Sequence, residues 1–157
     1  MTAKNIYLLL AREISTDSND SMNSIIKIIE KFGTSLDSKK LRQDKVDVEK
    51  TPIAVPYKYS VGSSWLFDEF IPKGSSIRLI IEFFDPNEKN LGSIQQENVL
   101  PKKVDRLSLN LNLDVFPVTY AGKYSLKGTL FLDEKKLATA DYTYEVEIQW
   151  IKDDGRD

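Results

Sequence analysis

Glu145 and Glu147 come closest, in type and spacing, to a pair of catalytic side chains. Residues two apart on a β-strand project from the same face, about 6.5 Å apart by strand rise. The two carboxylates of a glycoside hydrolase use a similar separation, one as proton donor and the other as nucleophile or base. Both glutamates, however, occupy polar positions of an alternating segment, and nothing in the sequence places them in a cleft. We therefore expect them on a solvated strand face, without a catalytic role.

The acidic turn at residues 85–90 is a candidate metal site, because it follows an apolar segment and carries several oxygen ligands. Asp85, Asn87 and Glu88 offer the carboxylate and amide oxygens that Ca²⁺ prefers, in a placement that slightly resembles the calcium loops of membrane-binding C2 domains. Only Asp114 suggests a contribution from a second loop. The alternative is turn chemistry, in which Asp, Pro and Asn side chains shape the local backbone. The sequence favours the turn and leaves calcium binding open.

Three aromatic residues, Trp65, Phe67 and Phe70, are the candidate partner-binding site. They lie among small and acidic residues just before Pro72, where the strand pattern weakens. Exposed aromatic side chains often supply much of the binding energy of a protein interface. Core packing is the competing explanation, so we expect only part of this cluster to be exposed and to contact a partner.

The sequence of 157 residues contains neither histidine nor cysteine. Imidazole is the side chain that titrates nearest neutrality, and the thiolate is the most reactive ready nucleophile and a common zinc ligand. The commonest routes to acid–base, covalent and zinc chemistry are therefore closed. We predict a protein that is not an enzyme and needs no cofactor.

The charge balance gives no sign of an anionic partner. Lys and Arg total 22 against 24 Asp and Glu, a net charge of −2 that offers no attraction for a phosphate backbone or an anionic lipid surface. The apolar run at residues 6–11 is far shorter than the roughly 20 residues that span a bilayer. The sequence therefore predicts a cytoplasmic protein that binds neither nucleic acid nor membrane.

The last third of the chain has the clearest strand pattern. Apolar residues alternate with polar ones from Asp141 to Trp150, and the same period of two marks residues 107–115 and 124–132. Such alternation is typical of strands with one face in a core and one in water. Three of these strands in succession indicate antiparallel pairing, with a four-residue hairpin turn at residues 133–136.

Further strands are expected upstream, at residues 6–11, 53–67, 77–84 and 91–99, separated by Pro, Gly and Asn turns. The segment at 77–84 is apolar on both faces, which favours a central strand. About eight short strands indicate an all-β, antiparallel, two-sheet immunoglobulin-like β-sandwich. A single domain is expected to cover residues 1–152, with a frayed tail at 153–157.

Two segments resist this interpretation. Residues 21–32 carry apolar side chains at helical spacing, which predicts a short helix, but their isoleucines are β-branched and favour a strand. Residues 34–50 are mostly charged, with the densest basic run at Lys39–Arg42, and we expect a charged surface excursion there.

With the strands placed, the order of local patterns resembles an uncharacterised family of small bacterial proteins of unknown function. The shared patterns are an opening run at Ile6–Ala11, a second strand at Asn23–Ile29, an Asp85-Pro86 turn, the run Ala121–Leu126 and a hairpin through Lys136–Ala138. Each member of that family is a single immunoglobulin-like β-sandwich. The resemblance implies this fold and a strand at 23–32, and it carries no functional residue.

This chain departs from the family at two points. The family usually has glycine in its second strand where Lys27 stands, and glycine after the Asp-Pro turn where Glu88 or Lys89 stands.

These observations together predict a non-catalytic interaction or assembly module that binds another protein or associates with itself. The alternative is a small-ligand-binding sandwich, which would bind carbohydrate through the aromatic cluster or, with calcium at the Asp85 turn, a lipid.

Overall fold

The computed structural model describes residues 1–16, 23–43, 47 and 50–151, and most of them lie in β-strands. The strands are β1 (Ala3–Thr16), β2 (Asn23–Ile28), β3 (Lys31–Asp37), β4 (Ile53–Ile71), β5 (Ser76–Phe84), β6 (Asn90–Val99), β7 (Val104–Val118), β8 (Gly122–Leu132) and β9 (Lys135–Ile151). One short helix, α1 (Ser38–Gln43), occurs in the described part of the chain. The all-β prediction is confirmed, and the described residues form nine strands in place of the expected eight or so.

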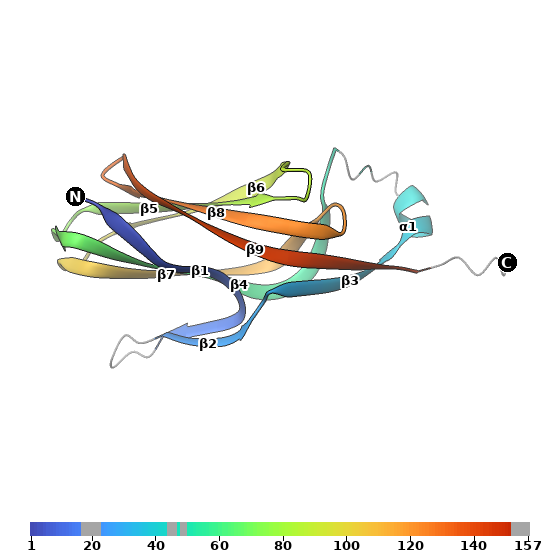
Figure 1. Ribbon diagram of the computed structural model, residues 1–157, viewed down its shortest axis with the longest axis horizontal. Helices are drawn as coiled ribbons and strands as arrows, with labels where there is room; N and C mark the ends of the chain where they lie inside the picture. The colour runs from blue at the N-terminus through green and yellow to red at the C-terminus, as the bar shows by residue number, and fades with distance from the viewer. Residues whose placement is uncertain (17–22, 44–46, 48–49, 152–157) are drawn as a thin grey trace.

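The strands form two sheets, which lie one above the other in Figure 1. The four-stranded sheet has the order β2-β1-β4-β7, and the five-stranded sheet has the order β3-β9-β8-β5-β6. Every described neighbouring pair is antiparallel except β3 and β9, which run parallel from Lys31 opposite Glu145 to Asp37 opposite Ile151. The prediction of two sheets is confirmed, and the prediction of purely antiparallel pairing is wrong at β3.

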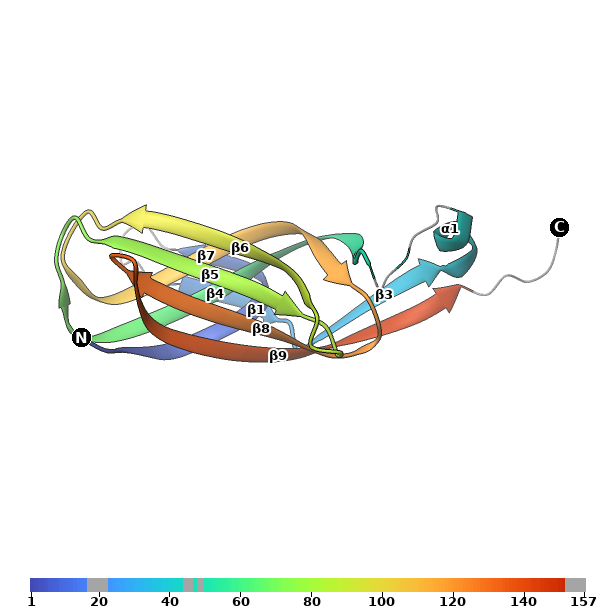
Figure 2. The ribbon, with the colours of Figure 1, turned by 90° about the horizontal axis from the view of Figure 1, so that it is seen from above.

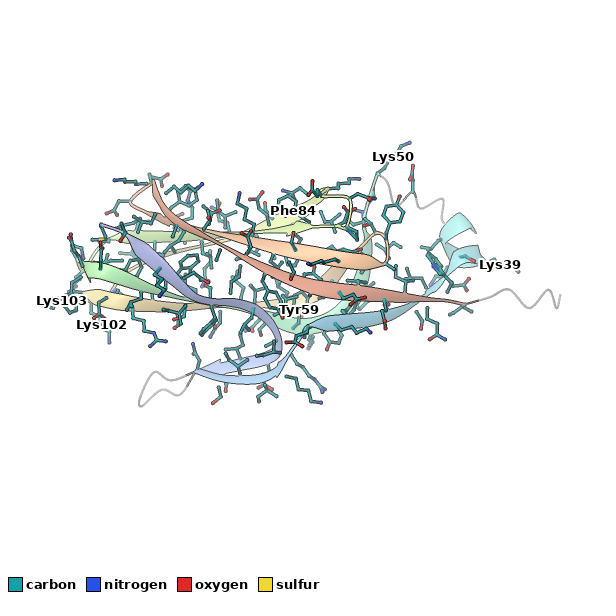
Figure 3. The ribbon with its side chains drawn as sticks, viewed as in Figure 1. Lys39, Lys50, Tyr59, Phe84, Lys102 and Lys103 are labelled. Carbon is teal, nitrogen blue, oxygen red and sulfur yellow. The ribbon has the colours of Figure 1, made fainter. Side chains whose placement is uncertain are left out.

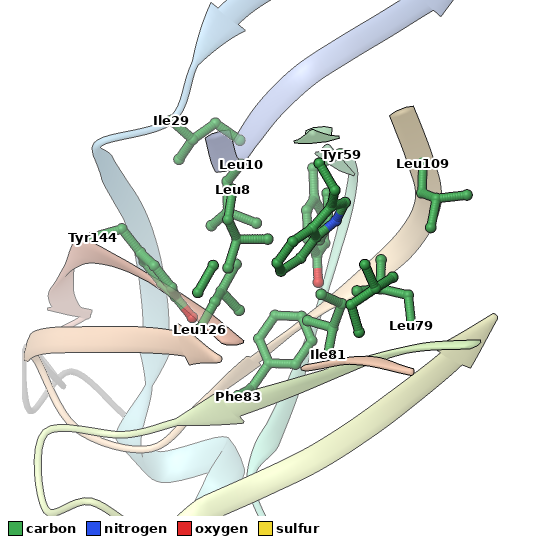
Figure 4. Close-up of a cluster of buried hydrophobic side chains, with 14 of the residues drawn as sticks. Leu8, Leu10, Ile29, Tyr59, Leu79, Ile81, Phe83, Leu109, Leu126 and Tyr144 are labelled. Carbon is green, nitrogen blue, oxygen red and sulfur yellow. The ribbon is translucent and has the colours of Figure 1, made fainter. Parts of the chain in front are cut away.

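The main core lies between the two sheets and contains a chain of aromatic rings. Phe32 of β3 stacks on Phe116 of β7, with ring centroids 4.1 Å apart. Phe116 also contacts Tyr59 of β4 at 4.8 Å and Tyr144 of β9 at 5.5 Å. Figure 4 shows Tyr59 and Tyr144 beside aliphatic side chains from both sheets. Because aromatic side chains bury large areas, this chain of rings ties β3 and β9 to β4 and β7.

The strands predicted in the last third of the chain are confirmed as β7, β8 and β9, and Tyr144 and Val146 face the core as expected. The turn between β8 and β9 is shorter than predicted, because only residues 133 and 134 separate the strands. Asp133 and Glu134 both have positive φ, 46° and 68°, as the mirror-image turns of two-residue hairpins require.

The predicted alternation of β7 continues only as far as Leu113. Val115 is exposed, and the next buried residue is Phe116, so the core-facing side changes. A register shift in the partner strand β4 lies directly opposite, between Pro56 and Tyr59. Such a β-bulge twists the strand pair locally and re-aims the side chains.

The central strand predicted at 77–84 is confirmed as β5, which lies between β8 and β6. Its residues alternate between buried and half-buried positions, because the face away from the core is only partly covered.

The segment 21–32 contains strands from residue 23 onward, and the helical alternative is wrong for the described residues. The chain leaves the four-stranded sheet at Ile29, whose N–H donates to the Leu10 carbonyl at 2.8 Å. It enters the five-stranded sheet at Glu30, whose carbonyl accepts from the N–H of Glu145 at 2.9 Å. This change of sheet explains the helix-like spacing, because Ile25 packs in a second cluster while Ile29 belongs to the main core.

The surface excursion predicted at 34–50 is wrong for its first residues. Residues 34–37 are the end of β3, and the basic run lies in α1. The Asp37 carboxylate accepts hydrogen bonds from the N–H groups of Lys39 and Lys40, at 3.0 and 3.2 Å, which is the geometry of a helix N-cap. The predicted tail at 153–157 lies outside the described residues.

Beyond Ala11, β1 pairs only with β2, and we call residues 12–16 and 23–28 the β1–β2 arm. The arm contributes Ile14 and Ile25 to a second cluster with Leu9 and Ala11, on the face of β1 that points away from the main core. Gly62 of β4 permits this packing, because a Cβ at that position would clash with the Ile14 side chain.

Tyr59 and Tyr144 provide a test of the core, because their hydroxyls differ. Tyr59 Oη donates to the Val115 carbonyl at 2.9 Å, whereas buried Tyr144 Oη has no hydrogen-bond partner among the described residues. Burial raises the pKa of both hydroxyls above the ordinary value of 10.0. The neutral tyrosines therefore stabilise the fold fully below about pH 10, and this stability is lost as the pH rises above that value.

We expect Tyr59→Phe to lower the free energy of unfolding at pH 7 by about 1 kcal/mol, because the Val115 carbonyl loses its partner, and Tyr144→Phe to change it by less than about 0.5 kcal/mol. Each variant should also lose less stability than the parent between pH 7 and about pH 11, since it has one ionisable tyrosine fewer. Urea unfolding at both pH values measures these effects. Equal losses of unfolding free energy in the two variants at pH 7 would contradict the conclusion that only the Tyr59 hydroxyl forms a hydrogen bond.

Candidate functional site

A groove of about 790 Å³ lies between the β1–β2 arm and the connection from β6 to β7. This volume is within the range of sites that bind small molecules or peptide side chains. Figure 3 places Lys102 and Lys103 at the end of the molecule that is remote from α1. The groove is lined by Tyr7, Asn23, Ile25, Phe70, Leu100, Pro101, Lys102, Lys103, Val104, Asp105, Arg106, Leu107 and Ser108.

One wall of the groove is set by the arm. Asn23 Nδ2 donates to Tyr7 Oη at 3.2 Å, which links the start of β2 to β1. Ile25 lies opposite Ile14 in the β1–β2 ladder, and both pack in the second cluster. The apolar packing of Ile14 and Ile25 and the hydrogen bond between Asn23 and Tyr7 therefore hold this wall in place.

The opposite wall is the start of β7, which is tied to β4 by polar side chains. Ser108 lies opposite Ser64, and their hydroxyl oxygens are 3.2 Å apart. Arg106 Nε donates weakly to the same Ser64 hydroxyl at 3.4 Å, so the guanidinium is positioned at the groove. These contacts fix the backbone of β7 while leaving the charge of Arg106 exposed to a ligand.

The charge of the lining is mainly positive. Lys102, Lys103 and Arg106 face a single acidic residue, Asp105. Among the described residues, no carboxylate forms an ion pair with any of these three cations. Lys103 Nζ instead lies 5.0 Å from the centre of the Phe70 ring, a cation–π contact. The groove can therefore take up an anionic group beside an aromatic surface.

Of the predicted aromatic cluster, only Phe70 is exposed, at 57% of its surface. Residues 67–70 of β4 lie opposite Asp105 alone in the β4–β7 ladder, and this irregularity carries Phe70 outward. Trp65 and Phe67 are buried, so core packing accounts for these two and their assignment to a partner-binding site is wrong. The small residues around Trp65 do not mark a weakening strand, because β4 is covered there by the main core on one face and by the arm on the other.

In the Asp85 turn, the carboxylate oxygens that a metal ion would bind accept hydrogen bonds from the protein instead. Asp85 is buried, and its Oδ1 accepts from the N–H groups of Asn87 and Lys89 at 2.8 and 2.9 Å. Its Oδ2 accepts from the Thr119 hydroxyl at 2.8 Å. Among the described residues, no three acidic side chains converge in a way that would hold a metal ion. Asp85 therefore forms the turn, as the alternative in the sequence analysis expects, and the metal-site hypothesis for Asp85, Asn87 and Glu88 stays a prediction.

Glu145 and Glu147 lie on the exposed face of β9, as the alternation predicts. The Glu147 carboxylate is 2.6 Å from Lys31 Nζ of the neighbouring strand β3, and both side chains are more than half exposed. The two glutamates are therefore brought together on an open surface.

Apart from Phe70, the residues that line the groove were not identified by sequence patterns. One wall comes from Tyr7, Asn23 and Ile25 and the other from residues 100–108, and only the folding of the arm across the four-stranded sheet brings them together. The pair Lys102-Lys103 after Pro101 is the signal in the sequence, but the denser basic run in α1 is more conspicuous.

No model of a known protein family matches the sequence, and no curated protein matches it. The described part of the chain contains no helix with the length and apolar character needed to cross a membrane. A functional proposal therefore has to rest on the geometry of the groove.

Asp85→Ala tests the structural role of the turn. It removes three hydrogen bonds to a buried carboxylate, and we expect a loss of about 2 kcal/mol or more in the free energy of unfolding. Asn87→Ala is the control, because Asn87 is exposed and its backbone donor is kept. Millimolar calcium should leave the Tm of the parent unchanged, whereas a rise in Tm would support the metal-site hypothesis.

The different environments of the two tryptophans provide a fluorescence test. Trp65 is fully buried, whereas Trp150 is 49% exposed. Trp150→Phe should leave blue-shifted emission that acrylamide quenches poorly, and Trp65→Phe should leave red-shifted emission that is quenched readily. Equal quenching in the two variants, both checked as folded by circular dichroism, would contradict the burial of Trp65.

Proposed function

We propose that this protein is a non-catalytic binding module that holds an acidic, extended segment of a partner protein in the groove. The observation that carries the proposal is the lining itself, in which no carboxylate of the described residues pairs with Lys102, Lys103 or Arg106, and Lys103 lies over the exposed Phe70 ring. Charge complementarity of this kind speeds association and selects the partner. An acidic segment with apolar side chains matches both features.

The position of the groove along β7 favours an extended segment. Residues 102–108 line the groove consecutively, although successive side chains of a strand point to opposite faces. A ligand that contacts such a run has to extend along β7, across the face of the four-stranded sheet, and an extended peptide segment has that shape.

The same proposal includes an immunoglobulin-like β-sandwich as the framework. It is supported by the strand orders β1-β4-β7 and β9-β8-β5-β6 and by Tyr124 at the start of β8. Tyr124 Oη donates to the Tyr120 carbonyl at 2.5 Å and accepts from the Thr119 N–H at 2.9 Å, the pattern of the tyrosine corner of such sandwiches.

The backbone supports the resemblance to the uncharacterised β-sandwich family at the two points where the sequence departs from that family. Lys27 stands where that family has glycine, and Glu88 is one of the two positions, with Lys89, at which the second glycine was placed; Lys27 and Glu88 have positive φ, 53° and 62°. Glycine adopts this conformation most readily, so the backbone agrees with the family pattern although the side chains do not.

Small-ligand binding is the weaker alternative. The Asp85 carboxylate is engaged in the turn, which disfavours calcium-dependent lipid binding there, and the burial of Trp65 and Phe67 leaves a carbohydrate only Phe70 to stack on. A non-catalytic role agrees with the open position of Glu145 and Glu147.

The test uses a fluorescently labelled octapeptide of alternating glutamate and valine, with binding followed by anisotropy. We expect the double variant Lys102→Glu/Lys103→Glu to bind it about tenfold more weakly or worse, because two attractive charges become repulsive. The matched control is Lys135→Glu/Lys136→Glu, which makes the same charge change at the exposed start of β9. A lysine–valine octapeptide serves as the control ligand.

Binding by the parent and by the β9 control, with a loss in the groove variant, supports the proposal. Absence of binding to the parent, or equal affinity in the two double variants, would overturn it. Thermal unfolding of all proteins checks that the fold is unchanged.

A further inference from the structure

Strand β3 is a border strand of the five-stranded sheet, and among the described residues it pairs only with β9, alongside whose last part it runs in Figure 2. The Glu30 carbonyl accepts from the Glu145 N–H, so the backbone groups of Glu30 point towards β9. Because these directions alternate along a strand, Phe32, Thr34 and Leu36 also direct their backbone groups to β9. The N–H and C=O groups of Lys31, Gly33, Ser35 and Asp37 therefore point to the open edge.

This edge has few of the features that usually prevent edge-to-edge pairing. The sequence from Lys31 to Asp37 contains no proline, and its charges lie only at the two ends. The core-facing side chains Phe32 and Leu36 are buried, which fixes the strand in place. Gly33 leaves the other face open, since no atom lies within 4 Å of the position that a Cβ would occupy.

A second copy of the same strand fits this edge in one fully paired register. Two identical strands that pair antiparallel about a two-fold axis through Thr34 bring Gly33 of each copy opposite Ser35 of the other. Every residue with outward-pointing backbone groups then meets another such residue, as hydrogen-bonded pairs of an antiparallel ladder require. Shorter overlaps leave donors and acceptors of the seven-residue strand unpaired.

The same register places opposite charges together. Lys31 of each copy lies opposite Asp37 of the other, and both residues are exposed on the same face of the strand. Directly opposed residues have Cβ atoms about 5 Å apart, and opposite charges at that distance stabilise the pair. The small Gly33 and Ser35 lie between the two charged pairs, above a shallow hollow of about 300 Å³ that Glu147 and Gln149 also line.

We propose that two copies of this chain form a two-fold symmetric dimer by antiparallel pairing of their β3 edges. The pairing joins the two five-stranded sheets into one continuous sheet, with Lys31 and Asp37 as the charged clasp at both ends of the ladder. The partner is a second copy because the edge complements its own sequence, as a symmetric interface requires. The binding groove lies on the other sheet, so the dimer is independent of the proposed function.

Charge reversal tests this register. Lys31→Glu alone sets like negative charges opposite each other in both pairs, and Asp37→Lys alone sets like positive charges opposite each other. Because the first also breaks the Lys31–Glu147 ion pair and the second the Asp37 cap of α1, thermal unfolding checks that both variants stay folded. Sedimentation velocity over a range of concentrations should show a reversible dimer for the parent and about tenfold weaker association or worse for each single variant. An equimolar mixture of the two single variants should form a heterodimer, because both of its cross-strand pairs are then complementary.

Ser35→Pro is the second variant, since it removes an outward N–H and no hydrogen bond to β9. It should abolish the dimer while circular dichroism and thermal unfolding report an intact fold. Lys50→Glu is the matched control for Lys31→Glu. It makes the same charge change and breaks the exposed ion pair with Asp47, away from this edge, so it should leave association unchanged.

A parent that stays monomeric at all concentrations would overturn the dimer. A mixture that associates no better than the single variants would overturn the register. The groove variant Lys102→Glu/Lys103→Glu should dimerise as the parent does, which separates this test from that of the proposed function.

Discussion

The contact between the two sheets is the interaction on which the rest of the structure depends. The chain has no cysteine, so no disulfide holds the sheets together, and burial of apolar surface has to do so. The aromatic chain from Phe32 through Phe116 to Tyr144 and Tyr124 crosses from the five-stranded sheet to the four-stranded sheet and back. Close packing of these rings fixes the positions of β3, β7, β8 and β9 relative to one another.

The change of sheet at Ile29 and Glu30 determines where both candidate surfaces lie. On one side of it, β2 stays with β1 and forms the arm that covers Gly62 and walls the groove. On the other side, β3 joins β9 and becomes the border of the five-stranded sheet. Tyr142 stabilises the connection between β2 and β3, since its hydroxyl donates to the Ile29 carbonyl at 2.6 Å. A single connection thus separates a groove on one sheet from an open edge on the other.

Residues that have the chemistry of a site can be used entirely by the fold. The Asp85 carboxylate satisfies two backbone donors and a hydroxyl, and Trp65 donates its indole N–H to the Ser63 hydroxyl at 3.0 Å inside the core. Buried polar groups need such partners, since an unpaired one costs stability. The groove differs, because its cations lie outside the hydrophobic core and keep their charge available for a ligand.

The sequence by itself determined the strands, because alternation with a period of two depends only on which face of each strand is buried. It identified the segments of β5, β6 and β8 closely and the later part of β9, and it limited the chemistry through the absence of histidine and cysteine. Only the tertiary structure decided which way residues 23–32 fold, whether Trp65 is exposed, and that Tyr7, Phe70 and Lys102 line one groove. These outcomes depend on contacts between residues far apart in the chain. The small residues around Trp65 are interior because other strands cover β4, and residues 23–32 have helix-like spacing because the chain changes sheet there. Local periodicity carries no information about such contacts, because it records the burial of a side chain and not the element that buries it.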